Sequence, residues 1–331
     1  MKDHRIAATG IILSSLLTGA SCLPLVPTAL AQQFVNPNSV MPVACSPAPE
    51  AKVQAPVCDS RAVEELALSG QAFTENQMGA ESALVLAPGR TIRDARKCFE
   101  KAARQGDSSA QVNLAVLYLN GWGVQKNYGT ALYWLNAAAQ QNNPRAHTNL
   151  AILYMNGLAV RQDDQEAMRH LQFAAGMGDA SAMVDLGYLY DSGLGTAKNQ
   201  AEAAKWYRLA AEQGDALGQN NLADLYLRGE GVPQNDAIAL QWFQKAAQQG
   251  NTAARIKLGY LFASGRAGRV DPEAAYAWIL AAQLAGDRRG DQYLPQLEKQ
   301  LTAEQLAHAR KHAQELLAAP VYNKVDLAFV R

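Results

Sequence analysis

Small and apolar residues recur along most of the chain at the spacing of helices rather than strands. After Asp107, the residues Ala110, Leu114 and Tyr118 stand at i, i+4 and i+8, on one face of a helix with 3.6 residues per turn. Asp107 suits the N-cap, because its carboxylate can accept hydrogen bonds from the free amides of the first turn. Gly121 suits the other end, because glycine adopts the positive φ that side chains resist. The pattern predicts a helix between Asp107 and Gly121.

A second helix is predicted directly after the first. Asn127 is again an N-cap residue, and Ala131, Trp134, Leu135 and Ala138 follow it on one helical face. The alternation of small and large side chains lets two helices approach closely while one bulky ring fills each layer. The two segments therefore predict an antiparallel helix pair.

This pair is predicted five times, because its diagnostic residues recur every 36 positions without insertion. The N-cap positions of the first and second helices are Asp107, Asn143, Asp179, Asp215 and Asn251, and Asn127, Asp163, Asn199, Asn235 and Asp271. One pair cannot cover its own apolar face, whereas copies stacked at constant pitch share a continuous core. The sequence predicts an all-α fold, a right-handed α-solenoid of stacked antiparallel helix pairs with a C-terminal capping helix at 302–318.

The repeated phrase resembles a known family. The pattern A-x-x-x-L-[AG]-x-x-Y-x-x-G-x-G-V, followed by Asx, A-x-x-W/F and A-A-x-x-G, is similar to Sel1-like repeats, relatives of the tetratricopeptide repeat, over roughly residues 95–288. His170 departs from it by standing where other copies carry Trp. The resemblance implies a role in signalling, secretion or the assembly of complexes.

Four regions are expected along the chain. Residues 1–31 are a signal peptide and 32–60 a Pro-rich extended linker. Residues 61–288 form the solenoid, with five regular units from about 107 and a degenerate first unit. Residues 289–331 form the C-terminal cap and tail.

The signal peptide is recognised by its three parts. Lys2 and Arg5 form a positive start, "IILSSLL" a short apolar core, and "ALA" ending at Ala31 a cleavage site before Gln32. Lipid attachment at Cys22 is the alternative. The apolar run is too short to span a bilayer, and no later segment resembles a transmembrane helix. We therefore expect an exported protein, in the periplasm or secreted, with a lipoprotein as the variant.

Three cysteines follow the predicted cleavage site, and export permits a disulfide among them. Cys45 and Cys58 bracket a Pro-rich stretch, so we expect these two to pair and Cys98 to be buried as a small apolar residue. Pairing of Cys58 with Cys98 is the main alternative.

Charge and motifs leave little room for catalysis. The chain has 30 basic and 30 acidic residues and no basic run, which argues against nucleic acid as a partner. His147 and His170 are interpreted as single residues in different units. His308 and His312 share a helical face with Glu315, but the metal-binding HExxH pattern is missing. No cofactor or metal is expected.

Two carboxylate pairs were weighed as acid–base groups. Asp163 and Asp164 are adjacent, and one of them is an N-cap. Asp191 and Asp224 are predicted to face the same groove, where a charged residue more often binds a partner. Neither pair predicts an active site.

The face of each first helix opposite its core side is unexpectedly apolar, whereas a helix with one buried side should be polar on the other. Either neighbouring helices bury this face, or it is an exposed strip that receives a peptide or partner helix. The predicted groove, along the concave face, comprises Val112, Val116, Leu119, Thr148, Ile152, Met155, Val184, Tyr188, Asp191, Asn220, Asp224, Leu227, Ile256 and Tyr260.

The sequence favours a non-catalytic scaffold or adaptor, exported or in the cell envelope, that binds a protein or peptide in this groove. The alternative is a cell-wall enzyme or ligand-binding protein, since some cysteine-rich relatives of the repeat are linked to β-lactam binding or hydrolysis. Those relatives carry a cysteine pair in each unit, which the units from Ala110 onward lack.

Overall fold

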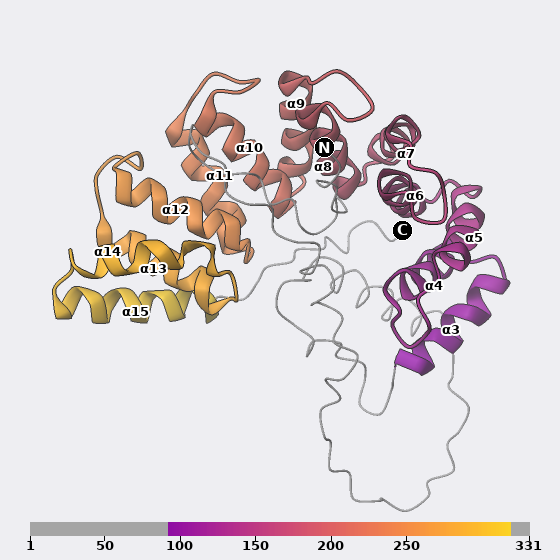
Figure 1. Cartoon of the computed structure of the whole chain (residues 1–331), viewed down its shortest axis with the longest axis horizontal. Coiled ribbons are helices and arrows are strands. Elements are labelled where there is room, and N and C mark those ends of the chain that lie inside the picture. The colour runs from indigo at the N-terminus through magenta and orange to yellow at the C-terminus, as the bar shows by residue number, and fades with distance from the viewer. Residues whose placement is uncertain (1–91, 319–331) are drawn as a thin grey trace, which may run out of the picture. The chain divides into compact units, whose positions relative to one another are not determined.

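A computed structural model describes residues 92–318, which are helical with no β-strand in that range (Figure 1). The helices are α3 (Ile92–Arg104), α4 (Ser108–Asn120), α5 (Tyr128–Ala139), α6 (Pro144–Asn156), α7 (Asp164–Gly176), α8 (Ala180–Ser192), α9 (Gln200–Glu212), α10 (Ala216–Arg228), α11 (Asp236–Gln248), α12 (Thr252–Ser264), α13 (Pro272–Leu284), the 3₁₀ helix η1 (Arg288–Tyr293), α14 (Leu294–Glu298) and α15 (Ala303–Ala318).

The caps that the sequence predicted set the helix ends. The Asp107 carboxylate accepts a hydrogen bond from the backbone N–H of Ala110 at 2.6 Å, and the Asn127 side chain accepts one from Thr130 at 2.9 Å. Gly121 ends α4 with a φ of 79°. Equivalent caps recur in the following pairs, so the fold class of stacked helix pairs is confirmed. The expected signal peptide, the linker and the first helix of the degenerate unit, 62–70, lie outside the described residues.

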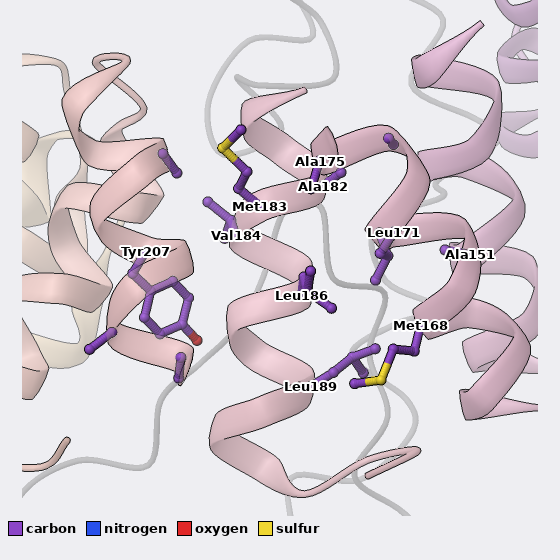
Figure 2. Close-up of a cluster of buried hydrophobic side chains, with 14 of the residues drawn as sticks. Ala151, Met168, Leu171, Ala175, Ala182, Met183, Val184, Leu186, Leu189 and Tyr207 are labelled. Atoms are coloured by element: carbon purple, nitrogen blue, oxygen red, sulfur yellow. The ribbon is translucent and has the colours of Figure 1, made fainter. Parts of the chain in front are cut away.

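Successive pairs share their core. Figure 2 shows one buried cluster in which Met168 and Leu171 of α7 face Leu186 and Leu189 of α8, with Tyr207 of α9 on the other side of α8. The same cluster reaches back to α6 and forward to α10. Each first helix is therefore enclosed by helices of its own pair and of both neighbouring pairs.

The C-terminal helix closes this stack. Thr302 and Gln305 form a capping box, in which each side chain accepts the backbone N–H of the other, at 3.2 and 2.9 Å. Ala309 of α15 is buried against Tyr276 and Ile279 of α13. The predicted capping helix is thus anchored on the last pair.

Arg255 ties the cap to the repeats. Its buried guanidinium donates to the carbonyl oxygens of Ala247, Ala281 and Leu316, at 3.3, 3.3 and 3.2 Å. These carbonyls lie near the C-terminal ends of α11, α13 and α15, where the helix dipole favours a cation. A single side chain therefore joins three helix ends.

The expectation that Cys98 stands unpaired is wrong. Cys98 in α3 is buried, as expected, but it is disulfide-bonded. Burial alone does not distinguish the two states, because a small apolar position accepts a thiol or a half-cystine equally well. Every other cysteine, including Cys45 and Cys58, lies outside the described residues, so the proposed pairing of those two stays a prediction.

A close contact between α8 and α9 depends on a glycine. A Cβ placed on Gly187 would lie 2.6 Å from Cε1 of the Tyr207 ring. Equivalent pairs of positions in the two preceding units hold Ala115 with Leu135, and Ala151 with Leu171. The Tyr207 ring thus lies so close to α8 that it leaves no room for a methyl group at position 187.

We predict that Gly187→Ala lowers the free energy of unfolding by about 1–3 kcal/mol, because the added methyl group overlaps a buried ring. Urea unfolding followed by circular dichroism measures the change. Combining Gly187→Ala with Tyr207→Leu copies the Ala151–Leu171 pair and should recover most of the loss. Equal destabilisation in the presence and absence of Tyr207 would contradict this account.

Candidate functional site

All residues of the predicted groove lie on the first helices α4, α6, α8, α10 and α12. The buried ones are Val112, Val116, Thr148, Met155, Val184, Asn220, Asp224, Leu227 and Ile256. The partly exposed ones are Leu119, Ile152, Tyr188, Asp191 and Tyr260.

Neighbouring helices account for the buried members. Val112 and Val116 of α4 belong to one hydrophobic cluster with Ala146 and Leu150 of α6, the first helix of the next pair. The apolar character of this face is therefore explained mainly by packing between units, the first of the two explanations above. A continuous exposed strip is not formed, and the candidate surface narrows to the partly exposed residues.

One buried ion pair joins two first helices at this face. The Nζ of Lys257 in α12 lies 2.8 Å from an Oδ1 oxygen of Asp224 in α10, and the two residues are only 8% and 4% exposed. Asp224 is thus a structural partner of Lys257. Of the two acids predicted to face the groove, Asp224 is therefore buried and Asp191 is partly exposed.

Asp191 belongs to a separate polar network. The side-chain amide of Gln200 donates to Asp191 at 3.4 Å and to Glu230 at 2.7 Å, and Arg228 lies 2.8 Å from Glu230. Ion pairs this exposed contribute little to stability. The network places two acids, Asp191 and Glu230, and one base, Arg228, beside the partly exposed residues of α8.

Asp185 of α8 is the most unusual polar residue of the fold. It is 0% exposed, and neither carboxylate oxygen has a hydrogen-bond partner among the described residues. Burial, followed by the negative charges of Asp179 and Asp215, raises the pKa of this carboxyl well above its usual value. The group is therefore held in a site that favours its neutral form.

Two histidines that the sequence appeared to separate are in contact, so their interpretation as single residues in different units was wrong. The Nδ1 atoms of His147 in α6 and His170 in α7 are 2.8 Å apart, and both residues belong to one helix pair. Phe173 lies over the His147 ring and Tyr154 stacks on the His170 ring. These four side chains form a half-buried cluster. Other copies of the repeat carry a tryptophan at the position equivalent to His170.

Burial controls the titration of this histidine pair. Desolvation lowers the pKa of His147, against a hydrogen bond with the Ala139 backbone. Desolvation and then His147 lower the pKa of His170, against the attraction of Glu166. The folded protein thus holds the pair neutral more strongly than the unfolded chain does.

The remaining candidate groups have structural roles. Asp163 caps α7 by accepting from the backbone N–H groups of Gln165 and Glu166. His308 of α15 contacts Glu273 of α13, and the ring of His312 meets the Trp278 ring edge-on. Within residues 92–318, no group of three or more His, Cys, Asp or Glu side chains is placed to hold a metal ion.

Sequence reasoning missed Asp185, Lys257 and the contact between the histidines. A signal for the first two was present, because residues 224 and 257 are separated by the same 33 positions as 152 and 185. Comparing the units position by position would have shown that Asp185 faces an apolar side chain. The contact between His147 and His170 had no such signal, since other units carry no equivalent pair.

Comparison with known proteins places these observations in context. The repeated helix pair and shared core define a helical repeat scaffold. A family model described as "Sel1 repeat" matches residues 92–107, 108–143, 144–179, 180–215, 216–251 and 252–287. The matches cover more than half of the chain, so this protein belongs to the Sel1 repeat family. No curated protein matched the chain at a significant level.

Solved structures support the same assignment. The Sel1 repeat protein from Oxalobacter formigenes is 32% identical with a TM-score of 0.58, over 67% of this chain and 88% of that one. The protective antigen c5321 of uropathogenic Escherichia coli strains is 30% identical with a TM-score of 0.56, over 76% of this chain. This chain spans only 54% of the length of that antigen.

The histidine pair makes stability depend on pH. Below about pH 6.5 the unfolded chain takes up protons that the folded pair resists, because both pKa values are lowered on folding. We therefore predict that the contribution of the pair to the free energy of unfolding falls between pH 7.5 and pH 5, whereas the opposite contribution of Asp185 is common to wild type and the variant below. His170→Trp, which restores the residue of positions 134, 206, 242 and 278, should reduce this loss.

Urea unfolding at both pH values measures the effect. His308→Gln is the matched control, because His308 is exposed and lies on α15. If His170→Trp and wild type lost the same stability on acidification, the pair would not be the responsible group.

Proposed function

We propose that this protein is an exported, non-catalytic interaction scaffold that binds a partner protein or peptide at the partly exposed residues of the predicted groove. The observation that carries the proposal is the contrast along the first helices. Ile152, Tyr188 and Tyr260 occupy equivalent positions in three units, and all three are partly exposed where Val116 and Asp224 are buried. Aromatic residues at such positions are typical anchors of protein interfaces.

Membership of the Sel1 repeat family supports the scaffold role. The antigen c5321 shows that a relative of 30% identity is described as a protective antigen in uropathogenic strains. A function in recognition at a surface is consistent with that description. Since fold alone does not name a function, the groove residues carry the specific proposal.

Export is the second part of the proposal and rests on the N-terminal sequence. The positive start, apolar core and "ALA" motif are the three parts of a cleavable signal. No helix among residues 92–318 is long and apolar enough to cross a membrane.

The groove is tested with Tyr188→Ala and Tyr260→Ala together. We expect crosslinking in cells, followed by mass spectrometry, to recover at least about tenfold less partner, because buried aromatic anchors contribute about 2 kcal/mol or more each. Tyr133→Ala is the matched control, since Tyr133 is 65% exposed on the second helix α5. Undiminished capture by the double variant, with a native circular dichroism spectrum, would contradict the assignment of the groove. Hydrolysis of nitrocefin by the purified protein would instead favour the enzyme alternative.

Export predicts a defined N-terminus. Protein recovered from the periplasm or medium should begin at Gln32 when analysed by mass spectrometry. Replacing Ala29 and Ala31 with bulky residues should leave the precursor uncleaved. A mature protein that begins at Cys22 and carries a lipid would instead establish the lipoprotein alternative, and an intact N-terminus in the cytoplasm would overturn export.

A further inference from the structure

Asp185 breaks the pattern of its own column of equivalent positions. The other units carry amides or a base there, and the column is Asn113, Asn149, Asp185, Asn221 and Lys257. Asp185 is the only acid among them, and both of its carboxylate oxygens are buried and unpartnered among the described residues. Burying a carboxyl without a partner is costly, and an asparagine at this position would avoid the charge. The acid therefore requires a specific explanation.

The ion pair in the later units shows what this position faces. Asp224 stands 72 positions after Ile152, and Lys257 stands 72 positions after Asp185; both separations equal two repeats of 36 residues. Because Lys257 lies 2.8 Å from Asp224, the repeat geometry sets Asp185 opposite Ile152. Between α10 and α12 the chain supplies both charges. Between α6 and α8 it supplies the acid alone.

Among the described residues, no cation compensates the charge of an ionised Asp185. The charged groups that act on it are Asp179 and Asp215, both acids at helix N-caps. The negative charge of an ionised Asp185 also contributes to the raised pKa of the Tyr207 phenol in α9. The surroundings therefore disfavour the anionic form of both groups. Arg145 of α6 is attracted to Asp179. The local charge is complementary to a cation from outside the described chain.

An approach to Asp185 is marked by the two partly exposed residues beside it. By the repeat, Ile152 of α6 stands at the position opposite Asp185, and Tyr188 lies one helical turn further along α8. The aliphatic stem of a lysine or arginine could pack on these two side chains while its charged end reached the carboxyl, as such side chains commonly do. A rearrangement of the Asp185 side chain or of Ile152 must accompany entry, because Asp185 has no exposed surface.

We propose that Asp185 is the acceptor for a lysine or arginine side chain of a partner that lies along the first helices and enters between Ile152 and Tyr188. This inference rests on the proposed function and adds the chemistry of the partner, a segment with a basic residue flanked by apolar ones. On binding, the neutral Asp185 carboxyl gives its proton to solvent and forms an ion pair with the cation. Binding is therefore stronger at higher pH.

The test uses two isolated side-chain analogues, n-butylguanidinium and n-butylammonium, with n-butanol as the uncharged control. The side-chain carbonyl carbon of residue 185, which both Asp and Asn carry, is followed by NMR up to about 50 mM ligand, a range suited to fragments of this size. We expect a saturable shift with the cations that strengthens with pH. Asp185→Asn should weaken binding about tenfold, since a hydrogen bond to a charged group is lost, whereas Asp191→Asn should not.

An internal version of the same test does not require a ligand. Ile152→Lys places a cation opposite Asp185, so it should raise the urea midpoint relative to Ile152→Met. In an Asp185→Asn background, Ile152→Lys should lower the midpoint instead. Asp185→Asn alone should be more stable than wild type at pH 7, and this gain should shrink towards pH 4, where the unfolded carboxyl also becomes protonated.

The ligand and stability tests can overturn the inference in three ways. One is equal binding of n-butanol and the cations, and another is no shift at Asp185 with either cation. The third is an Ile152→Lys effect of the same sign with and without Asp185. If Asp185→Asn captures a crosslinked partner as well as wild type does while Tyr188→Ala with Tyr260→Ala does not, the scaffold function stands and the cation site falls. If neither variant changes capture, the groove itself is wrong.

Discussion

A backbone hydrogen bond that repeats in every unit holds the architecture to constant pitch. The N–H of the second helix's N-cap residue donates to the carbonyl nine positions earlier, near the end of the first helix, at 2.7–3.0 Å; the donors are Asn127, Asp163, Asn199, Asn235 and Asp271. The loop between them packs against the preceding pair. A Cβ on Gly231, which has a φ of 68°, would lie 2.1 Å from the carbonyl oxygen of Gln200. Loop closure and unit spacing are thus fixed by the same few residues, which explains why the period tolerates no insertion.

Because every unit repeats one backbone, the interfaces between units differ only in their side chains. Gln111, Gln219 and Arg255 occupy one position and donate to the carbonyl eight residues earlier, at 3.2, 3.3 and 3.3 Å. Met183 stands at this position in α8 and has no side-chain N–H to give. The same pair of helices carries Asp185, and the preceding pair carries the His147–His170 contact in place of tryptophan. Helix α8 therefore lacks the side-chain hydrogen bond that Gln111, Gln219 and Arg255 make in their own units.

The fold could be predicted from the sequence because its signals are local. Asp107 and Gly121 define the ends of α4 through hydrogen bonds within a few residues, and recurrence multiplied that evidence. Burial of the opposite helix face could not be predicted in the same way. Amphipathic reasoning assumes that one side of a helix meets water, whereas Val112 meets the first helix of the next pair. The histidine contact and the disulfide at Cys98 depend on tertiary neighbours that periodicity does not specify.

Buried charges can distinguish one interface of such a stack from another. Any register of the helices that separated Lys257 of α12 from Asp224 of α10 would leave both charges buried without a partner. Separating a buried pair in this way costs about 3–5 kcal/mol, which favours the native order of units. Asp185 has no such role within the chain, because Ile152 opposite it is uncharged. The proposal that another molecule supplies the cation therefore assigns a role to a buried carboxyl that does not specify the chain's own register.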